Sequence, residues 1–379
     1  MINVLVFHAN IKKGGIERQI KYLFDYPSKN IGYKLLFAYY GKREKNISQS
    51  KINAVYIRWI FGNSRKKYKY LFYPFFILKL VFFVVHKKID IIHTYGPIEN
   101  ITASFLKLFL RIPIVVSVRT TAKDAFRLAR VWGNISDFII TNSYSIKEIL
   151  IRKYSIKNKK IRVIKNGIDN KKFYFCKANK YKRKDVYNFA LVGRFSRSKN
   201  QIDAIKAFSE LNKEEEKKIK LGLLLIGRID DNKYYEKIIE YIKFLELQDK
   251  IEIITWIDNI EYYYHTKIDC LILTSLTEGL PNVILEAMST GVPWISYDVA
   301  DTRYLAGNNF EYGVITKENT SKELLREMKS MINTNHSVIK RKMKSAREFV
   351  EKYYTIEDSI NKILSLYKHV ILQEEKARK

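Results

Sequence analysis

Residues 271–299 read LILTSLTEGLPNVILEAMSTGVPWISYDV, and this stretch decides the fold class of the chain. The apolar run Leu271–Thr274 is typical of a buried strand, and it ends in a short polar loop. Pro281 suits the first position of a helix, and the apolar positions after it predict a helix that Gly291 ends. Trp294–Ser296 is expected to form a second strand. Strand, helix and strand make one right-handed βαβ unit. The stretch therefore predicts a parallel α/β sheet with a ligand loop at the carboxyl ends of its strands.

Two carboxylates mark this unit, Glu278 just before the helix and Glu286 within it. At ~1.5 Å per residue they are displaced along the helix axis by about 7 to 10 Å, roughly the length of a diphosphate. Backbone N–H groups of Leu280, Asn282 and Val283 could hold phosphate oxygens, leaving one carboxylate for a sugar and the other for a ribose. The alternative is that Glu278 only favours the positive end of the helix and Glu286 is a solvated helix residue.

The same stretch resembles the retaining glycosyltransferases of family 4. Their pattern S-x-x-E-G-L-P-x-x-x-x-E-A-M-x-x-G-x-P is matched from Ser275 to Pro293. The resemblance implies two Rossmann-like α/β domains in the GT-B arrangement, with a cleft between them and a C-terminal helix returning to the first domain. It also implies that Glu278 contacts the transferred sugar and that Glu286 holds the ribose of a nucleotide-sugar donor. The other donor-binding residues of this loop would be Gly279, Leu280, Pro281 and Asn282.

A second donor motif is expected in the loop GRFSRSKN, residues 193–200, between a strand and a helix. Arg194 and Lys199 lie at its two ends, and two cations beside a helix N-terminus can stabilise a diphosphate leaving group. The loop matches the G-R-x-x-x-x-K-N pattern of family 4, which implies catalytic roles for both cations. The resemblance further implies donor contacts from Gly193, Gly227 and Trp256.

The first half of the chain offers further candidates at the ends of predicted strands. Gly14 and Gly15 follow the strand Val4–Phe7 and precede a helix; they would let the backbone approach the donor phosphates, or form an ordinary loop. His93, Arg119 and Asn142 each end a predicted strand and are candidates for the acceptor side, with a structural role as the alternative. Many family members have a histidine near Arg119, so its role is left open.

Charge is distributed unevenly along the chain. Residues 1–185 contain 39 Lys and Arg and 10 Asp and Glu, a net charge of +29, whereas residues 186–379 contain 30 and 29, a net charge of +1. A lysine-rich composition that merely reflects an A/T-rich genome would raise the net charge of both halves alike. We therefore expect the first half to face an anionic membrane surface.

The run Leu71–Val85 is almost wholly apolar, but Pro74 and Lys79 interrupt it and it is too short to span a bilayer comfortably. Two interpretations remain open. The run is either a core helix of the first domain or a helix whose apolar face enters the lipid headgroup region. In the second case the flanking lysines would contact anionic lipid: Lys66, Lys67, Lys69, Lys87 and Lys88.

We expect an N-terminal domain over residues 1–185, a nucleotide-sugar-binding domain over 186–355 and a closing helix over 356–379. The two cysteines, Cys176 and Cys270, suggest neither disulfides nor a metal site, and Met1 leads directly into a strand rather than a secretory signal. No metal or cofactor is expected, because cations and helix amides can serve the diphosphate. The expected location is cytoplasmic, at the inner face of the membrane.

The sequence thus predicts a retaining glycosyltransferase that moves a sugar from a nucleotide diphosphate, expected to be UDP, to an acceptor hydroxyl. The expected acceptor is a lipid-linked saccharide of cell-surface polysaccharide synthesis. Nucleotide-sugar epimerases and phosphorylases of the same fold are the nearer alternatives, and a glycosidase is disfavoured by the depth of Glu286 in its helix. A nucleic-acid-binding protein would suit the charge, but no nucleic-acid-binding motif accompanies it.

Overall fold

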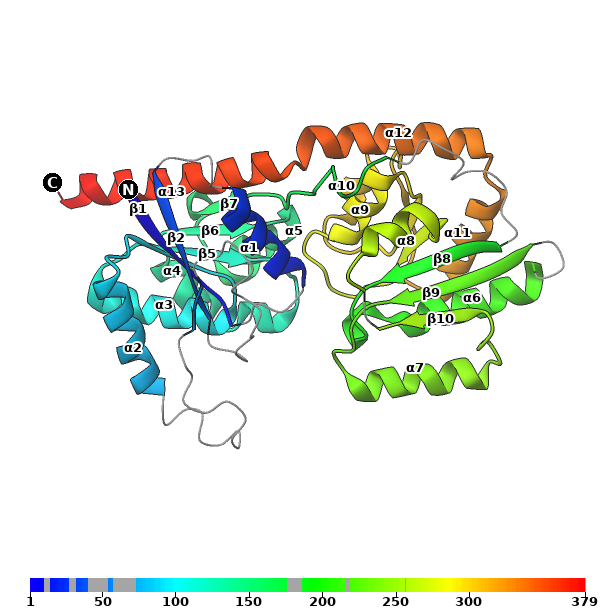
Figure 1. The fold of residues 1–379 in the computed structure, drawn as a ribbon, viewed down its shortest axis with the longest axis horizontal. Helices are drawn as coiled ribbons and strands as arrows, with labels where there is room; N and C mark the ends of the chain where they lie inside the picture. The colour runs from blue at the N-terminus through cyan, green and yellow to red at the C-terminus, as the bar shows by residue number, and fades with distance from the viewer. Residues whose placement is uncertain are drawn as a thin grey trace. The chain divides into compact units, whose positions relative to one another are not determined.

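The computed structural model describes residues 1–9, 14–26, 32–39, 54–56, 73–175, 186–215, 219–255 and 257–378. The chain forms two compact units (Figure 1). Unit 1 comprises Met1–Gly167 and Ile356–Lys379, and unit 2 comprises Ile168–Thr355.

Unit 1 is built on a parallel sheet of seven strands among the described residues, in the order β3-β2-β1-β4-β5-β6-β7. Its strands are β1 Ile2–Phe7, β2 Tyr33–Tyr39, β3 Ala54–Tyr56, β4 Ile91–Thr94, β5 Ile114–Val118, β6 Phe138–Thr141 and β7 Ile161–Val163. Its helices are α1 Gly15–Asp25, α2 Tyr73–His86, α3 Pro97–Leu110, α4 Ala129–Ile135, α5 Tyr144–Tyr154 and α13 Ile356–Arg378. Strands and helices alternate along the chain, as the sequence predicts for a parallel sheet.

The two faces of this sheet bury separate apolar clusters. Alternate residues of β1 point to opposite faces, so Leu5 and Phe7 pack with α2 to α5 whereas Val4 and Val6 pack with α1 and α13. On α13 the buried side chains recur at three- and four-residue spacing, the stripe of an amphipathic helix: Ile360, Ile363, Tyr367 and Val370. The return of the C-terminal helix to the first domain is thus confirmed.

Unit 2 has a parallel sheet of six strands in the part of the chain that the structure describes, in the order β10-β9-β8-β11-β12-β13. The strands are β8 Val186–Val192, β9 Lys220–Ile226, β10 Ile251–Ile254, β11 Cys270–Leu273, β12 Trp294–Ser296 and β13 Val314–Ile315. The helices are α6 Gln201–Glu215, α7 Asn232–Phe244, α8 Ile260–Thr266, α9 Asn282–Thr290, α10 Thr302–Ala306, α11 Ser321–Asn333 and α12 His336–Tyr353. One apolar core holds them together.

The βαβ unit predicted from residues 271–299 is present as β11, α9 and β12, with Leu271 paired to Trp294. Gly291 ends α9 in the left-handed conformation, with φ of 78°, and its N–H closes the last turn on Ala287 and Met288. Pro281 was expected as the first helical residue, but its extended backbone makes it the N-cap.

The chain passes between the units at Gly167/Ile168 and at Thr355/Ile356. The first point comes earlier than the expected boundary after residue 185, because Ile168 and Phe173 are buried in the core of unit 2. A hydrogen bond links the chain at these two points, because the N–H of Ile168 donates to the carbonyl of Tyr354 at 2.8 Å. Residues 176–185, which precede the expected boundary, lie outside the described residues.

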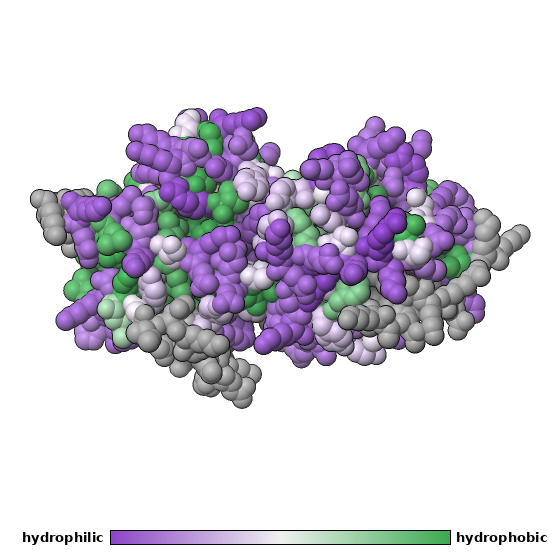
Figure 2. Space-filling model, turned by 90° about the horizontal axis from the view of Figure 1, so that it is seen from above, coloured by the Kyte–Doolittle hydropathy of each residue, from purple (hydrophilic) through white to green (hydrophobic). Residues whose placement is uncertain are grey.

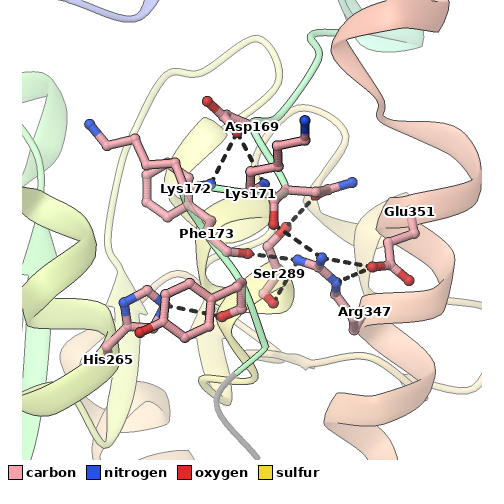
Figure 3. Close-up of polar contacts among 10 residues, drawn as sticks. Asp169, Lys171, Lys172, Phe173, His265, Ser289, Arg347 and Glu351 are labelled. Carbon is pink, nitrogen blue, oxygen red and sulfur yellow. Dashed lines mark hydrogen bonds and ion pairs between the residues drawn. The ribbon is translucent and has the colours of Figure 1, made fainter.

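Arg347 on α12 holds the beginning of unit 2 in place (Figure 3). Its guanidinium donates to the carbonyls of Phe173 at 2.6 Å, Ser289 at 2.9 Å and Asn170 at 3.3 Å, and it pairs with Glu351 at 2.7 Å. Ser289 lies in the last turn of α9, where a cation is favoured by the helix dipole. The side chain of Arg347 thereby joins the segment after Ile168, the end of α9 and α12.

Candidate active site

The loops after β8 and β11 meet at the carboxyl edge of the unit 2 sheet, because these two strands are neighbours. Lys199, from the first loop, donates from Nζ to Oε1 of Glu278, from the second. Their side chains are only 16% and 12% exposed, so water screens the pair weakly. Thr274 ties the loops further by donating to the carbonyls of Lys199 and Asn200 at 3.0 and 2.9 Å. The structure thus brings together two of the three predicted catalytic residues.

Arg194 lies near the same edge but pairs elsewhere. Its Nη1 donates to Oδ2 of Asp230 at 2.6 Å, and its side chain is 48% exposed. An exposed ion pair of this kind contributes little stability, so an incoming phosphate could replace Asp230 at small cost. Asp230 was not foreseen from the sequence, although it follows β9 in the segment GRIDD, where a site residue is expected.

Glu286 is 2% exposed on α9, which excludes its interpretation as a solvated helix residue. A buried carboxylate is costly unless polar groups surround it, so its position calls for hydrogen-bonding partners. The preceding donor loop has extended backbone at Pro281, the N-cap of α9, whose side chain makes no capping hydrogen bond. Leu280 of this loop is buried. Trp256, the predicted base contact, lies outside the described residues.

Two predicted donor glycines, Gly193 and Gly227, make a close backbone approach. The N–H of Gly193 donates to the carbonyl of Ile226 at 2.8 Å, and the side chain of Lys199 passes over Gly193. A Cβ at Gly227 would overlap the carbonyl oxygen of Gly193 and lie 3.2 Å from the nitrogen of Arg194. The loops after β8 and β9 can therefore touch only because Gly227 has no side chain.

We expect Gly227→Ala to push the Gly193–Arg194 backbone away and so to weaken nucleoside diphosphate binding by about tenfold or more, since phosphate sites depend on fixed donors. Calorimetric titration with UDP measures this. Gly222→Ala is not a clean control, because a Cβ there would overlap Asn188. Gly32 in unit 1 has a positive φ of 138°, as Gly227 has with 158°, but a Cβ there meets open space, so Gly32→Ala controls for the backbone strain alone. Wild-type affinity in folded Gly227→Ala would remove this contact from the site.

In unit 1, Gly14 is the N-cap of α1 with extended backbone, and Gly15 is the first helical residue. A Cβ on Gly14 would overlap the carboxylate of Glu17, which folds back over it. Gly96 has the same relation to Glu99 at the start of α3.

These two carboxylates, Glu17 and Glu99, flank a histidine that sequence reasoning missed. His8 lies 3.8 Å from Glu17 through Nε2 and 3.7 Å from Glu99 through Nδ1, and Glu99 is 2% exposed. The sequence did contain a signal, because the segments GGIE and GPIE repeat a G-x-I-E pattern at two helix starts. His8 follows β1 at the carboxyl edge of the unit 1 sheet, where a saccharide hydroxyl would find both donors and acceptors.

His93 is fully buried inside unit 1. Its Nδ1 is hydrogen-bonded with the hydroxyl of Tyr367 on α13 and its Nε2 with Oγ of Ser117 at 2.8 Å. Burial, followed by the nearby Arg119 guanidinium, holds the pKa of His93 well below its usual 6.5. The structure therefore places this candidate as a neutral contact between β4 and the C-terminal helix.

This environment makes stability depend on pH in a defined direction. Below pH 6.5 the unfolded chain protonates His93 whereas the folded chain does not, so the free energy of unfolding should fall as the pH falls. The contribution of this one group is at most about 1.4 kcal/mol per pH unit. Urea unfolding compared between the wild type and His93→Gln checks this. The variant should be less stable but should lose less stability on acidification, and equal slopes would contradict the assignment.

Arg119 and Asn142 stand side by side, because they follow the paired residues Val118 and Thr141 of β5 and β6. Arg119 donates to Oδ1 of Asn166, and its Cζ lies 5.3 Å from the ring centroid of Tyr95. Asn142 is 2% exposed, and within the described ranges its Oδ1 has no hydrogen-bond donor. The ends of β5 and β6 thus bring together the guanidinium of Arg119 and the amide of Asn142, whereas His93 is buried inside unit 1.

The order of these parts along the chain can be compared with known proteins. The model of Glycosyltransferase Family 4 matches residues 13–172, and the model of Glycosyl transferases group 1 matches residues 174–353. The chain is a family 4 glycosyltransferase. The boundary between the two matches falls at Phe173. It lies in the short segment that begins at Asn170 and is hydrogen-bonded to Arg347.

Curated relatives of this glycosyltransferase are distant. It is 25% identical over 232 residues to N-acetylgalactosamine-N,N'-diacetylbacillosaminyl-diphospho-undecaprenol 4-alpha-N-acetylgalactosaminyltransferase of Campylobacter jejuni, and the match spans 60% of each chain. It is 26% identical over 318 residues to UDP-Gal:alpha-D-GlcNAc-diphosphoundecaprenol alpha-1,3-galactosyltransferase of Escherichia coli, covering 76% of this chain and 77% of that enzyme.

Solved structures share the fold of the glycosyltransferase over nearly its whole length. The Anabaena protein HepE in complex with UDP and glucose aligns with a TM-score of 0.80 at 17% identity, covering 97% of this chain and 100% of that one. The two Rossmann-like domains of the GT-B fold, predicted from the sequence, are thereby confirmed.

Proposed function

We propose that this enzyme is a retaining glycosyltransferase that moves a sugar from a UDP-sugar to a hydroxyl of a saccharide carried on a lipid diphosphate. One observation carries the proposal: Lys199 and Glu278 form a shielded ion pair at the N-terminal end of α9. A cation at the phosphates and a carboxylate at the sugar are the two charges that this reaction needs.

The charges suit the transition state of glycosyl transfer, in which a cationic sugar leaves a dianionic diphosphate. Lys199 and Arg194 would neutralise the diphosphate, together with backbone N–H groups at the start of α9. Glu278 would face the positive charge that develops on the sugar. The hydrogen bond between Lys199 and Glu278 orients both side chains, each for its own role.

The names of the relatives support the choice of substrates. The E. coli enzyme takes UDP-Gal and acts on a saccharide linked to diphosphoundecaprenol, and the C. jejuni enzyme also acts on a diphospho-undecaprenol-linked saccharide. We accordingly place the enzyme in cell-surface polysaccharide synthesis, at the cytoplasmic face of a membrane that carries such an acceptor. None of the described helices is long and apolar enough to cross that membrane.

The test is nucleotide release from a panel of UDP- and GDP-sugars, with and without a lipid-diphosphate-linked saccharide as acceptor. We expect one UDP-sugar to release UDP only when the acceptor is present, and the anomeric configuration to be kept in the product. Epimerised sugar without an acceptor would indicate an epimerase, and dependence on inorganic phosphate would indicate a phosphorylase. Release from no nucleotide sugar under any condition would contradict the proposal.

Glu286→Ala should weaken UDP binding by about 1 to 3 kcal/mol, because the ribose hydroxyls would lose a charged acceptor. Calorimetric titration with UDP measures the loss. Glu210→Ala, which removes an exposed carboxylate from α6, is the matched control and should bind like the wild type. Unchanged affinity in a folded Glu286→Ala protein would place the ribose elsewhere.

A further inference from the structure

Helix α2 has two apolar faces, of which only one is covered. Phe76, Ile77, Leu80 and Val84 pack into the core of unit 1. On the other side the apolar residues recur at three- and four-residue spacing and are between 56% and 71% exposed: Phe75, Leu78, Phe82 and Val85. The segment is therefore a core helix, as one interpretation of the sequence expected, and its outer face is also apolar.

The neighbouring helix extends this surface. On α3, Phe105, Leu108 and Phe109 are between 45% and 68% exposed. α2 packs against α3, and both helices bury their inner faces in the same cluster, so their outer faces lie on the same side of the sheet (Figure 1). We call the seven exposed residues of the two helices the α2–α3 face.

Soluble proteins rarely group so many large apolar side chains at the surface. Figure 2 shows the more usual pattern on the face that it presents, where hydrophilic residues predominate and apolar ones are scattered between them. The α2–α3 face is thus a candidate surface for an apolar partner.

Charges around the face indicate which partner that is. Lys79 lies within the apolar stripe, Lys87 and Lys88 follow α2, and Arg111 follows α3; all four are exposed. Across residues 73–89 and 97–111 the charged residues are basic except Glu99, which is buried. A second copy of the chain would bring these cations against one another, whereas anionic lipid would pair with them.

We propose that the α2–α3 face enters the headgroup region of a bilayer containing anionic lipid, with the surrounding Lys and Arg at the phosphates. This proposal rests on the proposed function, because an enzyme with a lipid-linked acceptor must reach that acceptor at the bilayer surface. The sequence left this interpretation open for the run Leu71–Val85, and the structure adds the exposed residues of α3 to the face. Three of the flanking lysines named there lie outside the described residues: Lys66, Lys67 and Lys69. Apolar burial here makes a large share of the affinity independent of salt.

The test is co-sedimentation of the full chain with two kinds of vesicle, phosphatidylcholine alone and phosphatidylcholine with phosphatidylglycerol. We expect strong binding to the anionic vesicles, a partial loss at high salt and weak binding to the neutral ones. The double variant Phe82→Ser/Phe109→Ser should bind anionic vesicles about tenfold or more less tightly, since each phenylalanine ring loses its apolar burial. Phe244→Ser, which removes an even more exposed ring from α7 of unit 2, should bind like the wild type.

Insertion itself can be observed by fluorescence. In Phe82→Trp, the new indole should shift its emission to shorter wavelength with anionic vesicles and be quenched by brominated lipid chains. The same substitution at Phe244 should show neither effect. Wild-type binding by the double variant, an equal loss in Phe244→Ser, or no quenching at position 82 would overturn the proposal.

Two further outcomes separate this proposal from its alternatives. If sedimentation shows a dimer that the double variant converts to a monomer, the face is a subunit interface and the lipid proposal fails. If the enzyme transfers sugar to no acceptor yet binds anionic vesicles through this face, the proposed function fails and the surface stands. With a short-chain, water-soluble acceptor the double variant should keep wild-type transfer.

Discussion

Replacing Lys199 by alanine is expected to lower kcat by about 10²-fold or more, because the leaving diphosphate loses a positioned cation in a shielded site. The loss should be larger than for an exposed lysine, since Lys199 is mostly covered and already oriented by Glu278. Part of the loss reflects Glu278 itself, whose carboxylate would remain without its partner. UDP release in the presence of acceptor measures the rate.

The matched control is Lys206→Ala, which removes an exposed lysine from α6 in the same unit. It should retain wild-type turnover. Full activity in a folded Lys199→Ala enzyme would show that the phosphates are neutralised elsewhere, with Arg194 as the next candidate.

Glu278→Gln is expected to have the second large effect, a fall in kcat of about 10²-fold with little change in UDP affinity. Glutamine keeps the shape of the side chain and removes only its charge, so a group that acts on the cationic sugar should lose turnover rather than nucleotide binding. Steady-state kinetics with calorimetric titration of UDP separates the two. Equal losses in kcat and in UDP affinity would make Glu278 a binding residue.

Because Lys199 and Glu278 contact each other, their effects should not add. The double variant Lys199→Ala/Glu278→Gln should be less impaired than the product of the two single losses, since each single change already disturbs the partner. Strict additivity would indicate that the ion pair does not persist when the donor is bound.

Much of the fold could be predicted from the sequence because its signals are local. The apolar runs that became β4, β5 and β6, and the glycine that ends α9, each depend on residues within a few positions of one another. The alternation of strands and helices then allows only a parallel sheet. The candidate donor residues Lys199 and Glu278 could be named for the same reason, since each lies in a short motif.

The contacts within the site could not be predicted, because they depend on strand order. Lys199 reaches Glu278 only because β8 lies next to β11, although β9 and β10 come between them in the sequence. The burial of His93 requires Tyr367, which is far away in the chain. Composition likewise could not say which face of α2 is covered, since both faces are apolar and only packing distinguishes them.

The hydrogen bond from Ile168 to Tyr354 has a consequence for biosynthesis. The two ends of unit 2 are hydrogen-bonded to each other, and all its residues are contiguous in the sequence. Residues 168–355 therefore form a complete folding unit as soon as they have left the ribosome. Unit 1 must wait, because Ile360, Ile363 and Tyr367 of its core are translated after unit 2. The sheet of unit 1 is therefore translated before unit 2 and covered by α13 only after it, and a truncation before Ile356 should leave one side of this sheet exposed to chaperones and proteases.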